Sequence, residues 1–112
     1  MHKKILFLLL AAFSLVLVAC GGGEEAPETI KVGAVVPLSG PFAGGGAQVE
    51  RGYQMAVADI NEAGGVYVEE YDANIPLELI LLDDESDPNA TVSHLESLNS
   101  DENVVAYLGG FG

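Results

Sequence analysis

Short apolar runs alternate with stretches of helical periodicity along this chain, and this alternation limits the folds open to it. The runs occupy residues 30–36, 77–82 and 104–108, and each stops at proline, acidic or glycine residues that close a strand. Between them, apolar side chains spaced by three and four residues indicate two helices. Strands joined by helices are parallel, and such crossovers are right-handed. The pattern therefore predicts an α/β fold, a βαβαβ portion of a Rossmann-like parallel sheet.

The first helix is predicted to begin near Ala47 and to end at Gly64 and Gly65, which suit a helix C-terminus. Gly52 falls on its apolar face, at a propensity cost of about 1 kcal/mol relative to alanine. We expect that the missing side chain of Gly52 lets the helix approach the sheet closely.

The second helix is predicted to start after an N-cap at Asp87, with Pro88 at its first position. Val92, Leu95 and Leu98 give it a short apolar stripe that is expected to be buried. The third strand, 104–108, is also expected to be buried because it is apolar throughout.

A strand order of 2-1-3 would place one helix on each face and leave the third strand as an uncovered hydrophobic edge. The sequence is therefore interpreted as the first part of a larger domain. A polypeptide ending at Gly112 is expected to fold poorly or to aggregate.

The N-terminus has the pattern of an export signal. Lys3 and Lys4 precede an apolar run over 5–18 that is interrupted by Ser14 and is shorter than the roughly 20 residues of a membrane span. The run ends in LVAC, residues 17–20, which resembles the lipobox of bacterial lipoproteins, and this resemblance implies acylation of Cys20. We expect a signal peptide over 1–19, a lipidated cysteine and tether over 20–28, and a location in the cell envelope.

Charge excludes several classes of partner. All 17 acidic residues follow Cys20, whereas two of the four basic residues precede it, so Lys31 and Arg51 alone leave the mature chain at −15. Charge-driven binding to nucleic acid or to an anionic membrane surface is excluded. A single cysteine can form neither an internal disulfide nor a zinc site.

Two glycine-rich loops mark a candidate binding site. Ligands of open α/β sheets bind beyond the carboxyl ends of the strands, where the connections diverge. Loops 38–46 and 109–112 are expected to meet there, beside the N-terminus of the first helix, whose backbone N–H groups suit a carboxylate. These glycines equally suit loops that only turn the chain.

Other chemistries fit less well. The first loop lacks the lysine and the spacing of nucleotide-binding motifs. Asp83 and Asp84 could hold a divalent cation, but a solvated strand-to-helix loop explains them as well. A hydrolase would pair Ser39 with a base, and His94, the one histidine after Cys20, is expected on a helix surface.

Four segments in order resemble the opening third of the branched-chain amino acid (Leu/Ile/Val-type) substrate-binding proteins of ABC transporters. The resemblance covers about 29–112 and lies in IKVGAVVPLSGPFA (30–43), DINEAGGV (59–66), LDD with DP (82–84, 87–88) and YLGG (107–110). It implies a type I periplasmic-binding fold, in which two lobes close on a ligand and present it to a permease. Residues 29–112 would be a partial N-terminal lobe, non-enzymatic and without a cofactor.

The resemblance also implies ligand-binding residues. Leu108, Gly109 and Gly110 match the start of the family's loop after the third strand, although Gly110 and Gly112 stand where relatives often carry serine. Ser39, Phe42 and the glycines 44–46 are the candidates in the first loop, and Gly45 stands where some relatives place an aromatic ring. Segment 66–76 is longer and more acidic than the family's usual turn and is interpreted as a surface insertion.

Taken together, these features predict a lipid-anchored solute-binding component of an ABC importer for an amino acid or a similar small polar solute. Its partners would be the permease and ATPase subunits. The alternative is a membrane-tethered sensor or receptor domain of the same fold, and neighbouring genes would distinguish the two.

Overall fold

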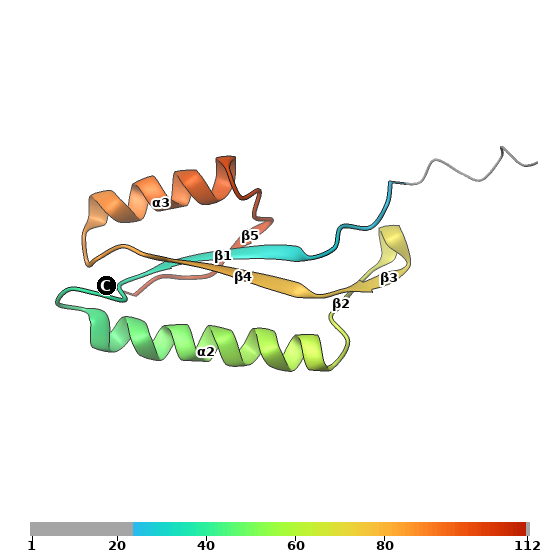
Figure 1. The fold of residues 1–112 in the computed structure, drawn as a ribbon, viewed down its shortest axis with the longest axis horizontal. Coiled ribbons are helices and arrows are strands. Elements are labelled where there is room, and N and C mark those ends of the chain that lie inside the picture. Colours follow the sequence, from blue (N-terminus) through green and yellow to red (C-terminus); the bar gives the residue numbers. More distant parts are fainter. Residues whose placement is uncertain (1–23, 112) are drawn as a thin grey trace, which may run out of the picture.

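The computed structural model describes residues 24–111, which form a three-layer α/β unit (Figure 1). Helix α3 covers one face of a central sheet and helix α2 covers the other. In chain order the elements are β1 (Ile30–Val36), α2 (Ala43–Glu62), β2 (Val66–Val68), the 3-10 helix η1 (Glu69–Tyr71), β3 (Ala73–Ile75), β4 (Leu77–Asp83), α3 (Pro88–Ser100) and β5 (Ala106–Tyr107). The predicted signal peptide and Cys20 lie outside the described residues.

Within residues 24–111, the central sheet has three parallel strands in the order β4-β1-β5. Ile30 lies opposite Leu77 and Val36 opposite Asp83, and on the other side Val32 lies opposite Ala106. This order is the predicted 2-1-3 arrangement, so the α/β fold class and the sheet topology are confirmed.

Strand β1 is the centre of the core because apolar side chains cover both of its faces. Its last five residues are buried, and Ala34 and Val36 have no exposed surface. Leu98 of α3 is also fully buried and packs against Gly33, where an added Cβ would lie 2.9 Å from Leu98 Cδ1. Burying a leucine contributes about 1.5–3 kcal/mol, so Leu98 stabilises the packing of α3 on the sheet.

Helix α2 begins at Ala43, earlier than predicted, and meets the sheet at a different glycine from the one expected. Gly46 is buried, and a Cβ there would overlap the carbonyl of Pro37. Gly52 is exposed, with no atom within 4 Å of a Cβ added to it, so the predicted close approach at Gly52 is wrong. The next residue, Tyr53, points toward the loop after β5, where its hydroxyl bonds the Gly109 carbonyl. Successive residues of a helix are rotated by about 100°, so Gly52 points away from the surface that packs on the sheet.

The predicted surface insertion is an ordered hairpin. Strands β2 and β3 pair antiparallel, with Val66 opposite Ile75, and η1 lies between them. Ile75 is buried, whereas Val66 and Tyr67 are exposed. Ile75 is therefore the residue that anchors the hairpin by burial. The hairpin lies at the end of the molecule opposite the carboxyl ends of the strands (Figure 1).

Strand β5 is shorter and more exposed than predicted. It spans Ala106–Tyr107 rather than 104–108, and Val105 and Tyr107 are 71% and 47% exposed. The predicted stripe of α3 is likewise only partly buried, because Val92 is 57% exposed beside Tyr107. Burial was predicted from composition, but β5 has β1 as its only neighbour in the described residues, so one side of it remains open.

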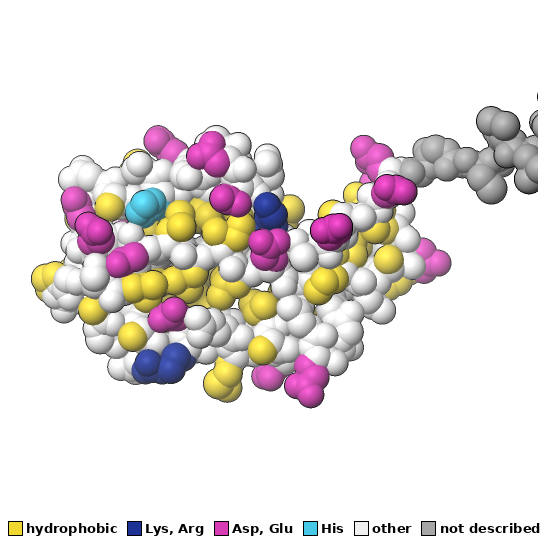
Figure 2. Space-filling model, viewed as in Figure 1, with side chains coloured by type: hydrophobic (Ala, Val, Ile, Leu, Met, Phe, Trp, Pro, Cys, Tyr) yellow, Lys and Arg dark blue, Asp and Glu magenta, His cyan; other side chains and the backbone are white. Residues whose placement is uncertain are grey.

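The opposite edge of the sheet is also partly open. Every residue of β4 is exposed or only half-buried. Figure 2 shows hydrophobic side chains gathered between the two helices, with acidic side chains spread around them. No helix in the described part of the chain is long and apolar enough to cross a membrane.

Candidate functional site

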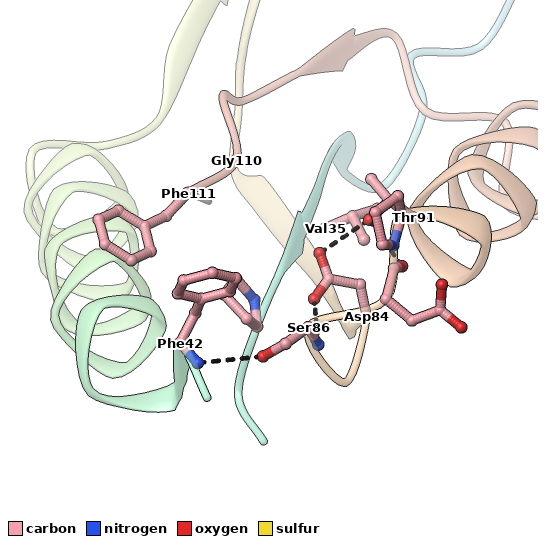
Figure 3. A pocket seen from close by; sticks show the side chains of 10 residues that line it. Val35, Phe42, Asp84, Ser86, Thr91, Gly110 and Phe111 are labelled. Atoms are coloured by element: carbon pink, nitrogen blue, oxygen red, sulfur yellow. Dashed lines mark hydrogen bonds between the residues drawn. The ribbon is translucent and has the colours of Figure 1, made fainter. Parts of the chain in front are cut away.

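The carboxyl ends of β1, β4 and β5 meet at one edge of the sheet, and a cavity of about 490 Å³ opens there (Figure 3). The loops that follow these three strands supply its walls, together with the first turn of α3. Its lining consists of Val35, Pro37, Phe42, Asp84, Ser86, Asp87, Pro88, Thr91, Gly110 and Phe111. The cavity lies where the sequence predicted a site.

Asp83, the last residue of β4, organises the loop that follows β1. Its Oδ1 accepts hydrogen bonds from the backbone N–H groups of Leu38 at 2.8 Å, Ser39 at 3.1 Å and Glu85 at 2.8 Å. The Glu85 amide, with further hydrogen bonding from Ser39 and Leu38, holds the pKa of the Asp83 carboxyl below its ordinary value of 3.8, against an opposing effect of desolvation. The carboxylate is therefore committed to the loop backbone.

Ser86 joins the same loop from the β4–α3 connection. Its hydroxyl donates to the carbonyl oxygen of Ser39 at 2.8 Å and accepts from the backbone N–H of Phe42 at 3.2 Å. Phe42 is the N-cap residue of α2 and makes no side-chain cap of its own. Ser86 thus supplies from another loop the hydrogen bond that holds the start of α2.

Asp84 is buried, with 6% of its surface exposed. Its Oδ1 accepts from the backbone N–H of Ser86 at 2.9 Å and its Oδ2 accepts from the hydroxyl of Thr91 at 2.9 Å. The expectation that the acidic run is only a solvated loop is wrong for Asp84, because this side chain is buried and its two oxygens accept hydrogen bonds from Ser86 and Thr91. Asp87, in contrast, caps α3 as predicted by accepting from the Asn89 N–H at 2.9 Å.

The loop after β5 is fixed by contacts with β1 and α2. Leu108 N–H donates to the Gly33 carbonyl at 2.8 Å, and the Tyr53 hydroxyl donates to the Gly109 carbonyl at 2.5 Å. The ring of Phe111 lies against Gly45, where any Cβ would overlap it. Figure 3 shows the rings of Phe42 and Phe111 close together on one side of the cavity.

The six predicted ligand-binding residues fall into three groups. Phe42 and Gly110 line the cavity, and Gly45 backs it through Phe111. The backbone of Ser39 is bound to Asp83 and Ser86, whereas Leu108 and Gly109 fix the second loop. Their contact with a ligand stays a prediction.

Eight of the ten lining residues were not among the predicted ligand-binding residues: Val35, Pro37, Asp84, Ser86, Asp87, Pro88, Thr91 and Phe111. Two of them had a usable signal, since Asp84 and Ser86 follow the strand that lies beside β1. Phe111 lies in loop 109–112, which was expected at the site, whereas Thr91 had no signal, because which side chains of a helix turn face a cavity depends on packing.

The cavity is mostly apolar and carries no lysine or arginine among its lining residues. Backbone N–H groups at the start of α2 already have hydrogen-bond partners within the chain: Ala43 N–H donates to the Gly40 carbonyl, and Gly45 N–H donates to the Phe42 carbonyl. No cluster of three or more metal-ligating side chains occurs in residues 24–111. The arrangement suits a ligand with an apolar portion.

Residues 29–112 match the model of the periplasmic binding protein family. The chain belongs to this family. Periplasmic binding proteins are binding proteins rather than enzymes, and the three-layer fold with β4-β1-β5 order is that of their type I members.

Among curated relatives, Leu/Ile/Val-binding protein homolog 7 of Brucella abortus is 32% identical over 111 residues, which is 99% of this chain and 25% of that protein. Leu/Ile/Val-binding protein homolog 1 of the same species is 32% identical over 77 residues, covering 69% of this chain and 19% of that protein. The chain therefore spans about a quarter or less of the length of these relatives.

A solved structure resembles this periplasmic binding protein in fold as well. It is the branched-chain amino acid transporter substrate-binding protein LivJ from Streptococcus pneumoniae, crystallised in complex with isoleucine. The TM-score is 0.64 at 31% identity, and the match covers 72% of this chain and 22% of that one.

Proposed function

We propose that residues 29–112 form the first part of the N-terminal lobe of a solute-binding component of an ABC importer. The ligand is a branched-chain amino acid or a similar small polar solute. The permease and ATPase subunits of the importer are its partners, and the protein acts outside the cytoplasm.

The observation that carries this proposal is the cavity at the carboxyl edge of the sheet, in a chain whose sequence and fold resemble those of an isoleucine-bound protein. Its apolar lining, with Phe42, Phe111 and Pro37, suits an aliphatic side chain. The ligand's carboxylate and ammonium are then held by groups outside this lining, because the Ser86 and Thr91 hydroxyls and the amides at the start of α2 are bonded within the chain.

Isothermal titration of the full-length protein tests the proposal. Leucine, isoleucine and valine are expected to bind, whereas the corresponding amides and urea, which lack the carboxylate, are expected to bind more weakly. Absence of binding by every one of these compounds would contradict the proposed ligand class.

Two substitutions connect binding to this cavity. Phe42→Ala removes a ring from the cavity wall and is expected to weaken amino acid binding. Met55→Ala is the matched control, because Met55 is an exposed apolar residue of α2 that does not line the cavity. Equal affinities of both variants and the unchanged protein would place the ligand elsewhere.

We also propose that Cys20 is lipidated and that 20–28 tethers the domain to the membrane, which rests on the LVAC motif behind an apolar signal. The full-length protein is then expected to partition into detergent and to show the mass of an acylated N-terminus. Cys20→Ser is expected to lose both properties. A Cys20→Ser variant that still partitions into the detergent phase would refute the lipid anchor.

A further inference from the structure

Helices α2 and α3 lie on opposite faces of the sheet, yet both begin at its carboxyl edge (Figure 1). Phe42 precedes the first turn of α2, and Thr91 lies in the first turns of α3. The sheet separates the bodies of the two helices, so a link between their first turns passes around this edge.

A continuous hydrogen-bonded chain makes that link. The Thr91 hydroxyl donates to Asp84 Oδ2, Asp84 Oδ1 accepts from Ser86 N–H, and the Ser86 hydroxyl accepts from Phe42 N–H while donating to the Ser39 carbonyl. Figure 3 shows the chain passing along the cavity, and Thr91, Asp84, Ser86 and Phe42 all line it. We call these four residues the edge network.

The edge network is built at a conformational cost. Glu85 and Ser86 both have positive φ angles, of 56° and 64°, in the left-handed region that disfavours residues other than glycine. Two successive residues in this region persist only where surrounding contacts hold them, and such strain gathers at functional sites. Here the contacts are those of Asp83 with Glu85 N–H and of Asp84 with Ser86 N–H.

We infer that Ser86 is a positioning residue for ligand binding, which holds the loop after β1 and the Phe42 ring in their binding geometry; this inference rests on the proposed function. The Ser86 hydroxyl bonds both ends of segment 39–42, through the Ser39 carbonyl and the Phe42 N–H, whereas Asp83 holds only its start, through the Ser39 N–H. A loop that is ordered before the ligand arrives avoids an entropic cost on binding.

Two variants of the full-length protein test this role. Ser86→Ala removes the hydroxyl and keeps the backbone strain, whereas Ser86→Gly removes the hydroxyl and relieves the strain. Ser100→Ala is the matched control, because the Ser100 hydroxyl also makes two hydrogen bonds, to the Glu96 carbonyl and Asp101, at the far end of α3.

Amide hydrogen exchange in the absence of ligand is the first measurement. Protection of the Phe42 amide is expected to fall in both Ser86 variants and to stay unchanged in Ser100→Ala. The second measurement is the Kd for isoleucine, which is expected to rise about tenfold in both Ser86 variants, because the loop must then be ordered when the ligand binds.

The outcomes separate this inference from the proposed function. Unchanged Phe42 protection overturns the inference whatever the ligand is. Lost protection with an unchanged Kd also overturns it, because the loop would then be held without effect on binding. If the unchanged protein does not bind isoleucine or the other amino acids, the proposed function fails and the ligand role of Ser86 fails with it. If Ser86→Gly, which is free of strain, loses protection and affinity as Ser86→Ala does, the hydroxyl itself is the cause.

Discussion

Two glycines of helix α2 have opposite roles, although the sequence presents both as departures from helix propensity. Gly46→Ala is expected to destabilise the full-length protein by about 1–3 kcal/mol, because its Cβ would overlap the buried carbonyl of Pro37. Gly52→Ala is expected to stabilise it by up to about 1 kcal/mol, since the added methyl meets open space and alanine favours the helix. Urea unfolding of both variants measures the difference.

Gly46 and Gly52 lie on the same helix, so each variant is the control for the other. A destabilised Gly52→Ala variant would contradict the observed exposure of that position. A Gly46→Ala variant of unchanged stability would mean that the start of α2 can move away from the sheet without loss.

The carboxylate of Asp83 is expected to make stability depend on pH. Its pKa is lowered in the folded chain, so the ionised form stabilises the fold above the unfolded-state value of about 3.8, and this stabilisation disappears as the pH falls through the lower folded-state value. Asp83→Asn is expected to be less stable than the unchanged protein at pH 7. The gap should narrow as the pH falls below about 3.8, because Asp83 of the unchanged protein is then protonated first in the unfolded and then in the folded chain.

Chemical unfolding of the full-length protein at a series of pH values measures this gap. Glu62→Gln is the control, because Glu62 is an exposed acid at the far end of α2 from the loop. A constant gap between Asp83→Asn and the unchanged protein from pH 7 to pH 3 would show that the charge of Asp83 does not stabilise the loop.

At the scale of elements, a single amide attaches the end of α2 to the start of β4. Asn61 Nδ2 donates to the Leu77 carbonyl at 2.8 Å, and Leu77 N–H donates to Asn61 Oδ1 at 2.7 Å. These are the bonds that a neighbouring strand would make, so Asn61 closes the outer edge of β4 at its first residue. Asn61→Ala is expected to cost about 2 kcal/mol, because both backbone groups of Leu77 lose their partner.

Gln54→Ala is the matched control for Asn61→Ala. The Gln54 amide bonds only the exposed side chain of Glu50, so its loss is expected to change stability by less than about 0.5 kcal/mol. Equal unfolding midpoints for the two variants would show that the contact between Asn61 and Leu77 adds nothing to the packing of α2.

Strand β1 and the Asp87 cap could be predicted because local patterns determine them. A β-branched run closed by proline and an aspartate before a proline need no distant partner to be recognised. The 2-1-3 strand order was expected from the family resemblance, because right-handed crossovers alone allow other orders. The length of β5 could not be predicted, since pairing depends on neighbours as well as on composition. Gly46, rather than Gly52, is the glycine of α2 in close contact with the chain beneath it. This was missed because the helix was predicted to begin near Ala47, whereas it begins at Ala43.

The sequence predicted the place of the candidate site in the fold, but only some of the residues that line it. Topology brings loops 38–46 and 109–111 together, so two of the predicted residues, Phe42 and Gly110, line the cavity. Asp84 and Ser86 were missed because their role is cooperative: each is placed by hydrogen bonds to backbone groups more than 40 residues away or to its own turn. Such bonds follow from the packed structure and leave no periodic signal, so the sequence marks these two residues only by their place after the strand beside β1.

For the molecule as a whole, the exposed edges of the sheet are the property that most affects its behaviour. Val105, which precedes β5, and Tyr107 of β5 are exposed, and Tyr107 lies beside the exposed Val92 of α3. Unpaired strand edges with apolar side chains promote association between copies. A polypeptide of residues 24–112 is therefore expected to self-associate, whereas the full-length protein, if it has the extent of its relatives, should cover this surface.

Lysine at the β5 edge should suppress this association. When two such edges pair, the lysine side chains lose their hydration and the two positive charges repel each other. The double variant Val105→Lys and Tyr107→Lys of residues 24–112 is expected to show a smaller mass by light scattering at the same concentration. Met55→Lys is the control, since Met55 is 67% exposed and equally apolar but lies on α2, away from both sheet edges. If Met55→Lys reduces association as much as the double variant, general charge rather than the β5 edge governs it. If residues 24–112 are monomeric with a sharp, cooperative thermal transition, the two helices and the Asn61 contact stabilise this unit without any further strand.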